Sequence, residues 1–406
     1  MQKPHSRLLQ SPAAMNTATC PPLTPTAVVR DERWRLSPRG AVLWTCSWRC
    51  SSTEAPRSPP TARVLLLNGY NSNVASQHDW LAGWLMTHGC EVHSFDNHSF
   101  GRSTAENEHR VRSSSLFDAL KRTIARWLFA HGKLGYVRRW DDLVDDVCWY
   151  TETLREERGH LPTVLYGESM GGALALCAQQ KLDVLGAPPL AGLILSAPMC
   201  SLGSAALPHP LLVALGSLLA WIIPTVPAPF LKDLTDCIFR NVERRAEALR
   251  NPYRLAGPPR IGTAFAMKAG SEAAARAASR VNTPLLLLHG TNDVVCPPAA
   301  SLAVFNSCKS QDKTLIEYES AWHALWAETV DTRRRLLADV LSFLATRTGT
   351  SLPHGICPDG SDPLTLSPAA HGRGLRLRRP LGVAEWRDES AFTAAREAHL
   401  HSCVRG

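Results

Sequence analysis

One short stretch constrains the fold more than any other, because an apolar run there gives way to a helical run across only five residues. The apolar run TVLY (163–166) favours a buried strand, and GALALCAQQ (172–180) favours a helix. Between them lies GESMG (167–171). A strand and a helix joined this closely need a tight turn in which a side chain at either glycine would collide. The stretch therefore predicts a strand–turn–helix unit that raises the Ser169 hydroxyl above the edge of a sheet.

Further apolar runs of similar length recur along the chain. They are RVLLLN (63–68), EVHSF (91–95), GLILSA (192–197), PLLLLH (284–289) and TLIEY (314–318), preceded by a hairpin pattern at 32–48. Helical patterns lie between them, as in DDLVDDVCWYTETL, which places Leu143, Val147, Tyr150 and Leu154 on one face. Strands that alternate with helices at this spacing predict a mostly parallel, doubly wound α/β sheet.

Composition divides the chain into five parts. We expect a disordered leader (1–27), a first core part (28–199) with an insert (104–134), a helical excursion (200–272), a second core part (273–346) and a largely disordered tail (347–406). The excursion contains many helix formers and no clear strand, whereas the tail is rich in Pro, Gly and Arg. An organelle transit peptide is the alternative interpretation of the leader, which lacks acidic residues over its first thirty positions.

The net charge of +8 does not indicate nucleic-acid binding. Residues 102–139 alone hold nine Lys and Arg against three Asp and Glu, and no zinc-knuckle spacing or basic heptad region is present. Twelve irregularly spaced cysteines and the lack of a secretory apolar region favour reduced thiols in a cytoplasmic compartment. The longest apolar segment, residues 211–223, would reach about 20 Å as a helix, which is too short to span a membrane.

Two residues farther along the chain could activate the serine. A serine hydroxyl is a weak nucleophile until a base takes its proton, and that base needs an orienting carboxylate. Asp293 follows the run PLLLLH, and His323 follows TLIEY, so both stand just beyond predicted strands. A helix-capping aspartate and an ordinary loop histidine are the alternatives. Ser169, Asp293 and His323 together predict a catalytic triad, and we interpret His289, at the end of its strand, as structural.

The stretch GYNSN (69–73) follows another predicted strand. Attack on a carbonyl places negative charge on its oxygen, which N–H donors can stabilise. We expect the backbone N–H of Met170, directly after the serine, to be one donor and that of Tyr70 to be the second, because Gly69 lets the main chain approach closely. A plain turn is the alternative. The proposed reaction needs no cofactor and no metal, and the sequence shows no HExxH or other ordered ligand cluster.

At these motifs the sequence resembles the monoacylglycerol lipase and lysophospholipase group of α/β-hydrolases, a serine aminopeptidase-like branch. The resemblance spans roughly residues 28–346 and is carried by GESMGGALAL, LILSAPMC, HGTNDVVCPP, DKTLIEYESAWHAL, FDNHSFGRS and WDDLVDDV. It implies an α/β-hydrolase fold with a mostly parallel eight-stranded sheet. It also implies a helical cap between strands six and seven, and hydrolysis of a monoacylglycerol or a similar monoacyl lipid by Ser169, His323 and Asp293. A lysophospholipase and a small-ester carboxylesterase are the alternatives within this class, and acyl transfer to an alcohol would share the acyl-enzyme.

The chain departs from the family at two places. The family usually has His-Gly where this chain has Asn68 and Gly69, and residues 98–101 keep only part of a Gly-His-Gly pattern. These departures motivate an alternative from another class, an inactive hydrolase scaffold that docks on membranes or partners.

The insert has no family counterpart. It predicts a basic amphipathic helix with one apolar face, formed by Leu116, Leu120, Ile124, Trp127 and His131. The sequence leaves two roles open for that face: docking on an anionic membrane surface, or packing against the cap. Cys296, three residues past the acid, predicts a thiol near the site, where a thiol reagent would block access.

Overall fold

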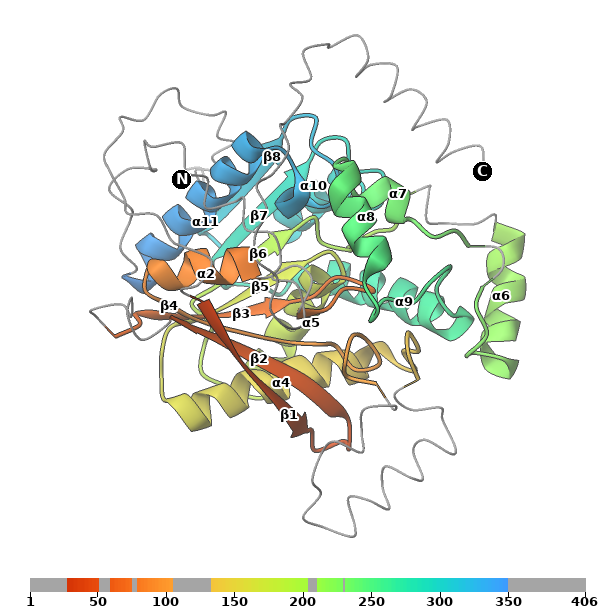
Figure 1. The fold of residues 1–406 in the computed structure, drawn as a ribbon, viewed down its shortest axis with the longest axis horizontal. Helices are drawn as coiled ribbons and strands as arrows, with labels where there is room; N and C mark the ends of the chain where they lie inside the picture. Colours follow the sequence, from red (N-terminus) through yellow and green to blue (C-terminus); the bar gives the residue numbers. More distant parts are fainter. Residues whose placement is uncertain are drawn as a thin grey trace, which may run out of the picture.

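A computed structural model of the chain describes residues 28–50, 59–74, 79–104, 133–203, 210–228 and 231–349. The leader, almost all of the tail and the amphipathic helix predicted within the insert lie outside the described residues. The described part forms one central sheet with helices on both faces, as Figure 1 shows.

The sheet contains eight strands among these residues, in the order β1-β2-β4-β3-β5-β6-β7-β8. They are β1 (Val28–Leu36), β2 (Val42–Cys50), β3 (Ala62–Leu67), β4 (Cys90–Phe95), β5 (Thr163–Glu168), β6 (Gly192–Ser196), β7 (Leu285–Gly290) and β8 (Lys313–Tyr318). Strand β2 runs antiparallel to both neighbours, and every other pairing is parallel. The predicted mostly parallel eight-stranded sheet is confirmed, and so is the hairpin, which is β1 paired with β2.

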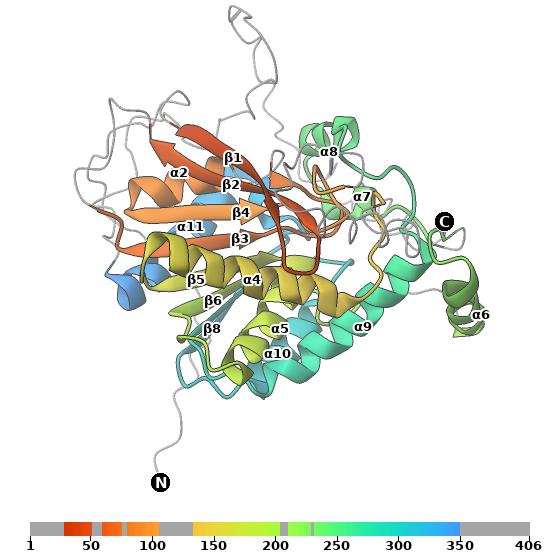
Figure 2. The same ribbon diagram turned by 90° about the horizontal axis from the view of Figure 1, so that it is seen from below.

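Helices cover the sheet in two layers (Figures 1 and 2). The described helices are α2 (Asp79–Thr87), α4 (Trp140–Arg158), α5 (Met170–Val184), α6 (Pro210–Ile222), α7 (Thr235–Ile238), α8 (Val242–Arg250), α9 (Ile261–Ala278), α10 (Pro298–Ser307) and α11 (Val330–Thr348), with a 3₁₀ turn at Leu325–Ala327. Helices α2 and α11 pack on one face of the sheet, and α4, α5, α9 and α10 pack on the other. This is the doubly wound arrangement predicted from the alternation of apolar runs and helical patterns.

Strand β3 shows how the sequence divides the core between the two faces. Successive side chains of a strand point to opposite faces. Val64 and Leu66 therefore lie in the cluster under α2 and α11, whereas Leu65 and Leu67 lie in the cluster under α4 and α5. All four are at most 1% exposed, and burial of each such side chain contributes about 1.5–3 kcal/mol. Side chains buried on both faces are mostly apolar, which explains the run at 64–67, and the one buried charge of the strand, Arg63, pairs with Glu91 at 3.1 Å.

Helices α6 to α9 all lie between β6 and β7 in the chain. Helix α9 crosses residue 272, the boundary expected between the helical excursion and the second core part. It packs against α4, α5 and α10, and its approach to α4 is close, because a side chain at Gly270 would collide with the indole of Trp140. Helix α6 also packs against α9 and lies at the right-hand edge of the molecule in Figure 1.

Parallel strands end at a shared edge of the sheet, and this edge places the candidate site. The segments that follow β3, β5, β7 and β8 all leave the sheet at their carboxyl ends. They carry Tyr70, Ser169, Asp293 and His323 in turn. The residues singled out from four distant parts of the sequence thus belong to one edge.

Candidate active site

Ser169 occupies a strained turn between β5 and α5. Its backbone φ is 52°, in the left-handed region that residues other than glycine seldom adopt. A Cβ at Gly171 would collide with the carbonyl oxygen of Leu67 in β3, and a Cβ at Gly167 would collide with the backbone of Gly171. Both glycines are therefore required for the predicted strand–turn–helix unit, which the structure contains.

Asp293 is a buried carboxylate surrounded by hydrogen-bond donors. Its Oδ1 accepts hydrogen bonds from the backbone N–H groups of Val295 at 2.8 Å and Cys296 at 2.9 Å. Its Oδ2 lies 2.7 Å from Nδ1 of His323 and 3.1 Å from Nε2 of His289. Burial alone would raise the pKa of Asp293, but the charge of His323 and the hydrogen bonds from both histidines hold it well below its usual range.

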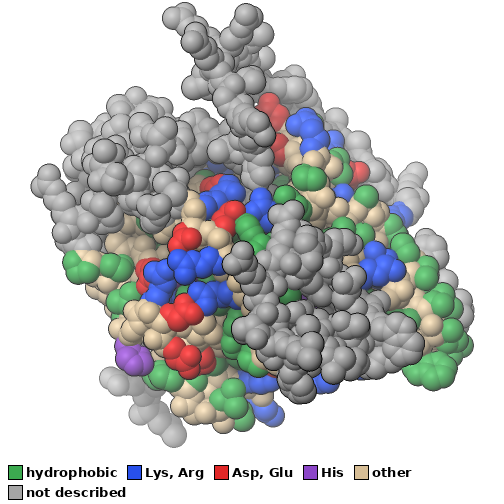
Figure 3. Space-filling model, turned by 60° about the horizontal axis from the view of Figure 1, so that its bottom comes forward, with side chains coloured by type: hydrophobic (Ala, Val, Ile, Leu, Met, Phe, Trp, Pro, Cys, Tyr) green, Lys and Arg blue, Asp and Glu red, His purple; other side chains and the backbone are tan. Residues whose placement is uncertain are grey.

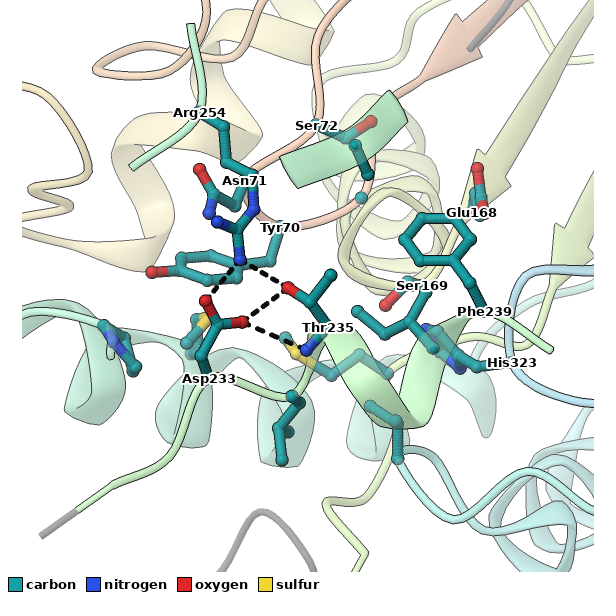
Figure 4. Close-up of a pocket in the computed structure, with 18 of the residues that line it drawn as sticks. Tyr70, Asn71, Ser72, Glu168, Ser169, Asp233, Thr235, Phe239, Arg254 and His323 are labelled. Carbon is teal, nitrogen blue, oxygen red and sulfur yellow. Dashed lines mark hydrogen bonds and ion pairs between the residues drawn. The ribbon is translucent and has the colours of Figure 1, made fainter. Parts of the chain in front are cut away.

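His323 is oriented by that carboxylate. A carboxylate can only accept, so Nδ1 of His323 carries the proton, and Nε2 remains as the acceptor of the neutral ring. The imidazole is 3% exposed and lines the same pocket as Ser169 (Figure 4). Although burial lowers the pKa of His323, the charge and hydrogen bond of Asp293, with a smaller effect of Glu168, raise it above its usual value. The structure thus joins the predicted acid and base by a hydrogen bond and brings the predicted nucleophile to the same pocket.

His289 contacts the acid directly, a role that its interpretation as structural left out. Its Nδ1 lies 2.7 Å from the Ser301 hydroxyl, and its Nε2 lies 2.9 Å from the carbonyl oxygen of Cys296 as well as near Asp293. Nε2 therefore carries the proton, and Nδ1 accepts from Ser301. Its position near the end of β7, four residues before Asp293, could have indicated this contact with the acid.

The two expected oxyanion donors lie beside the serine. Met170 is the first residue of α5, so its N–H has no acceptor within the helix. Tyr70 follows Gly69, where an added Cβ would stand 3.4 Å from the Cβ of Ser169. Within the described part of the chain, neither N–H is hydrogen-bonded to another backbone group. Both groups are therefore free to donate to a substrate oxygen, and their role remains a prediction.

The pocket in front of Ser169 has a volume of about 410 Å³ and is lined largely by apolar side chains. These include Met199, Leu202, Leu231, Leu234, Ile238, Phe265, Met267 and Val295. Its polar wall, drawn in Figure 4, is formed by Asp233, Thr235, Arg254 and the side chain of Tyr70. Arg254 pairs with Asp233 and bonds the hydroxyl of Thr235, whose N–H donates to Asp233 at 3.0 Å. The Tyr70 hydroxyl is buried without a hydrogen-bond partner among the described residues.

A reciprocal pair of hydrogen bonds joins this wall to the loop after β3. Asn71 Nδ2 donates to the carbonyl oxygen of Leu255, and the Leu255 N–H donates to Asn71 Oδ1, both at 2.8 Å. The sequence did not indicate Asp233, Arg254 or this connection, because residues 184 positions apart become neighbours only in the folded chain.

Cys296 lines the pocket, as its position in the sequence suggested. It is 1% exposed, and burial, followed by the charge of Asp293, raises its pKa well above the usual value. The thiolate is the reactive form, so this thiol should react slowly with maleimide. Seven cysteines of the described part are free.

A family model described as serine aminopeptidase, S33 matches residues 58–330. Among curated proteins, the chain is 25% identical over 254 residues to the monoglyceride lipase of Rattus norvegicus, covering 60% of this chain and 81% of that protein. It is 28% identical over 165 residues to caffeoylshikimate esterase of Arabidopsis thaliana, covering 41% of this chain and 49% of that protein.

Among solved structures, a soluble variant of monoglyceride lipase from Saccharomyces cerevisiae, in complex with a substrate analog, superimposes with a TM-score of 0.64. The match covers 81% of this chain and 99% of that chain at 19% sequence identity, a level that speaks for the fold alone.

Proposed function

The chain belongs to the serine aminopeptidase S33 family and is an ester hydrolase with the α/β-hydrolase fold, and we propose that it cleaves monoacylglycerols. The observation that carries the proposal is the composition of the pocket. One region is apolar enough for an acyl chain, and one wall offers hydroxyl and charged groups that pair with each other. A monoacylglycerol has the same two parts, an acyl chain and an alcohol with two free hydroxyls.

The reaction that we propose has two steps. Ser169 Oγ forms a bond to the ester carbonyl carbon while Nε2 of His323 takes its proton, and His323 then gives that proton to the departing alcohol oxygen. The Asp293 carboxylate keeps the proton on Nδ1 and stabilises the imidazolium that forms. The N–H groups of Tyr70 and Met170 stabilise the negative oxygen of both tetrahedral intermediates. In the second step His323 activates water, which releases the fatty acid and restores the serine. Release of the acyl group to an alcohol in place of water would require only another nucleophile.

The polar wall supports a neutral, hydroxyl-bearing alcohol as the leaving group. A hydroxyl both donates and accepts, so it can bond the Asp233 carboxylate and the Arg254 guanidinium together. The buried hydroxyl of Tyr70, which has no hydrogen-bond partner among the described residues, would gain one from the alcohol. Asp233 also neutralises Arg254, which weakens attraction for the phosphate of a lysophospholipid. The two other ester classes, lysophospholipids and small aromatic esters, therefore fit this wall less well.

We also propose that the segment from α6 to α8 is the predicted cap and that it touches a lipid surface. Residues of α6 and the turn after it leave large apolar side chains exposed, including Leu218 at 56%, Trp221 at 84% and Ile222 at 58%. Hydrophobic side chains gather at the edge where α6 lies (Figure 3). Among the described residues, no helix is both long enough and apolar enough to span a bilayer. Contact through an exposed apolar face requires no spanning helix.

A panel of four substrates tests the proposal. Purified protein is offered 1-oleoylglycerol, methyl oleate, oleoyl-lysophosphatidylcholine and p-nitrophenyl acetate, and kcat/KM is measured for each. We expect 1-oleoylglycerol to be hydrolysed fastest. In Tyr70→Phe its advantage over methyl oleate should fall about tenfold, because a hydrogen bond to the alcohol is lost. Tyr136→Phe, a buried tyrosine that does not line the pocket, is the matched control. Preference for the lysophospholipid or the acetate would contradict the proposal.

A further inference from the structure

The triad and the oxyanion donors leave one buried carboxyl group of the pocket without a role. Glu168 ends β5, directly before Ser169, and its side chain is 8% exposed. It lines the same pocket as Ser169 and His323, on the side away from the Asp233–Arg254 pair (Figure 4). Its neighbours on this side include Trp326, whose ring packs edge to face with Phe239 at 5.8 Å. A carboxyl group thus stands against aromatic rings next to the nucleophile.

Glu168 has no cationic partner of the ordinary kind. Within the described ranges, no Lys or Arg forms an ion pair with it. The basic residues that line the pocket lie between β6 and β7, and three of them pair with other carboxylates: Arg244 with Glu247, Arg254 with Asp233 and Lys268 with Glu272. The titratable groups coupled to Glu168 are His323 and Tyr166. The imidazolium form of His323 is therefore the positive charge available to it.

The two groups influence each other in the expected direction. Burial raises the pKa of Glu168 to about 7, and the charge of His323 opposes that rise. In turn, Glu168 adds to the effect of Asp293 in raising the pKa of His323. When His323 is protonated, it lies under the influence of two carboxylates: that of Asp293, hydrogen-bonded to Nδ1, and that of Glu168, on the same side of the pocket. Protons therefore leave the pair in coupled steps.

We infer that Glu168 is a positioning residue whose negative charge stabilises the imidazolium of His323 during catalysis. The inference rests on the proposed function, because it assumes that His323 is the general base. In that mechanism His323 becomes positive in both steps, once when it takes the Ser169 proton and once when it takes a proton from water. A carboxylate in the apolar wall lowers the energy of each charged state without touching the substrate. The neutral serine and imidazole of the resting site gain much less from it.

The test is the pH dependence of kcat/KM for p-nitrophenyl butyrate in Glu168→Gln, which removes the charge and keeps the shape. Loss of a nearby negative charge lowers the pKa of His323, so the acidic limb should move to lower pH by about one unit. The plateau above that limb should fall about tenfold, because the imidazolium loses stabilisation of the same size. Glu247→Gln, which lines the same pocket but is not coupled to His323, is the matched control and should leave the limb in place.

Two outcomes would overturn the inference: an acidic limb of Glu168→Gln that coincides with the wild-type limb, or an equal displacement in Glu247→Gln. A second variant, Glu168→Asp, keeps the charge, so its limb should stay closer to wild type than that of the Gln variant. If the Gln variant does not fold, a limb of Glu168→Asp displaced by a full unit refutes the inference. Full activity of His323→Ala would instead refute the proposed function itself, so the two failures are distinguishable.

Discussion

Replacement of Asp293 by Asn tests the proton arrangement that the structure contains. The amide oxygen of the new side chain would accept the hydrogen bonds that Val295 and Cys296 donate to Oδ1 of the acid. Its NH₂ group would then face Nδ1 of His323 and Nε2 of His289, where Oδ2 stands in the wild type. Two donors cannot bond each other, so His323 would move its proton to Nε2 and accept through Nδ1. The nitrogen that must take the serine proton would already carry one.

The wrong tautomer should lower kcat strongly and change the stability of the fold only slightly. A change of this kind lowers kcat about 10⁴-fold in a serine protease, equal to about 5 kcal/mol of transition-state stabilisation. We expect a similar loss here, measured with p-nitrophenyl butyrate at pH 8. Asp339→Asn is the matched control, because Asp339 accepts a hydrogen bond from the Tyr318 hydroxyl at 2.8 Å and does not line the pocket. It should retain activity within about twofold of wild type. An Asp293→Asn enzyme with more than a tenth of wild-type kcat would refute the tautomer argument.

Three further changes test neighbouring parts of the account. Gly171→Ala would drive a methyl group into the Leu67 carbonyl and should cost about 1–3 kcal/mol in urea unfolding; a wild-type midpoint would show that the elbow tolerates a side chain. His289→Gln should lower kcat/KM about tenfold through the weakened hydrogen bond to Asp293, and an unchanged rate would make His289 purely structural. Because the folded pKa of Asp293 is depressed, its ionised form stabilises the fold above about pH 4, and that stability is lost as the pH falls. The melting-temperature gap between wild type and Asp293→Asn should therefore narrow from pH 7 to pH 3, and a constant gap would contradict the assignment.

The sequence predicted the features that depend on local chemistry. The run at 64–67 in strand β3 was predictable because side chains buried on both faces are mostly apolar, and the elbow was predictable because only glycine fits at positions 167 and 171. The mostly parallel sheet predicted from the alternation of strands and helices is confirmed among the described residues, and so are the eight strands that the family resemblance implied. The hydrogen bond between Asp293 and His323 agrees with their predicted places beyond two strands, since parallel neighbours bring such loops together.

Features that depend on contacts between distant segments could not be predicted. The order of β2, β4 and β3 in the sheet depends on which strands pair with each other. Short strand sequences of similar composition do not specify their neighbours. Glu168 occupies a position that the motif leaves open, so only the folded chain shows that it lines the same pocket as His323. The pairing of Asp233 with Arg254 likewise depends on how the chain folds between β6 and β7.

Covalent labelling of the intact protein tests the central claim most directly. A fluorophosphonate reacts with a serine only when a base activates it, and the adduct can be located by mass spectrometry of proteolytic peptides. The account predicts one adduct, on Ser169, that disappears in both Ser169→Ala and His323→Ala while each variant keeps the wild-type melting temperature within a few degrees. Labelling that persists undiminished in Ser169→Ala, or an adduct mapped to another serine, would contradict it.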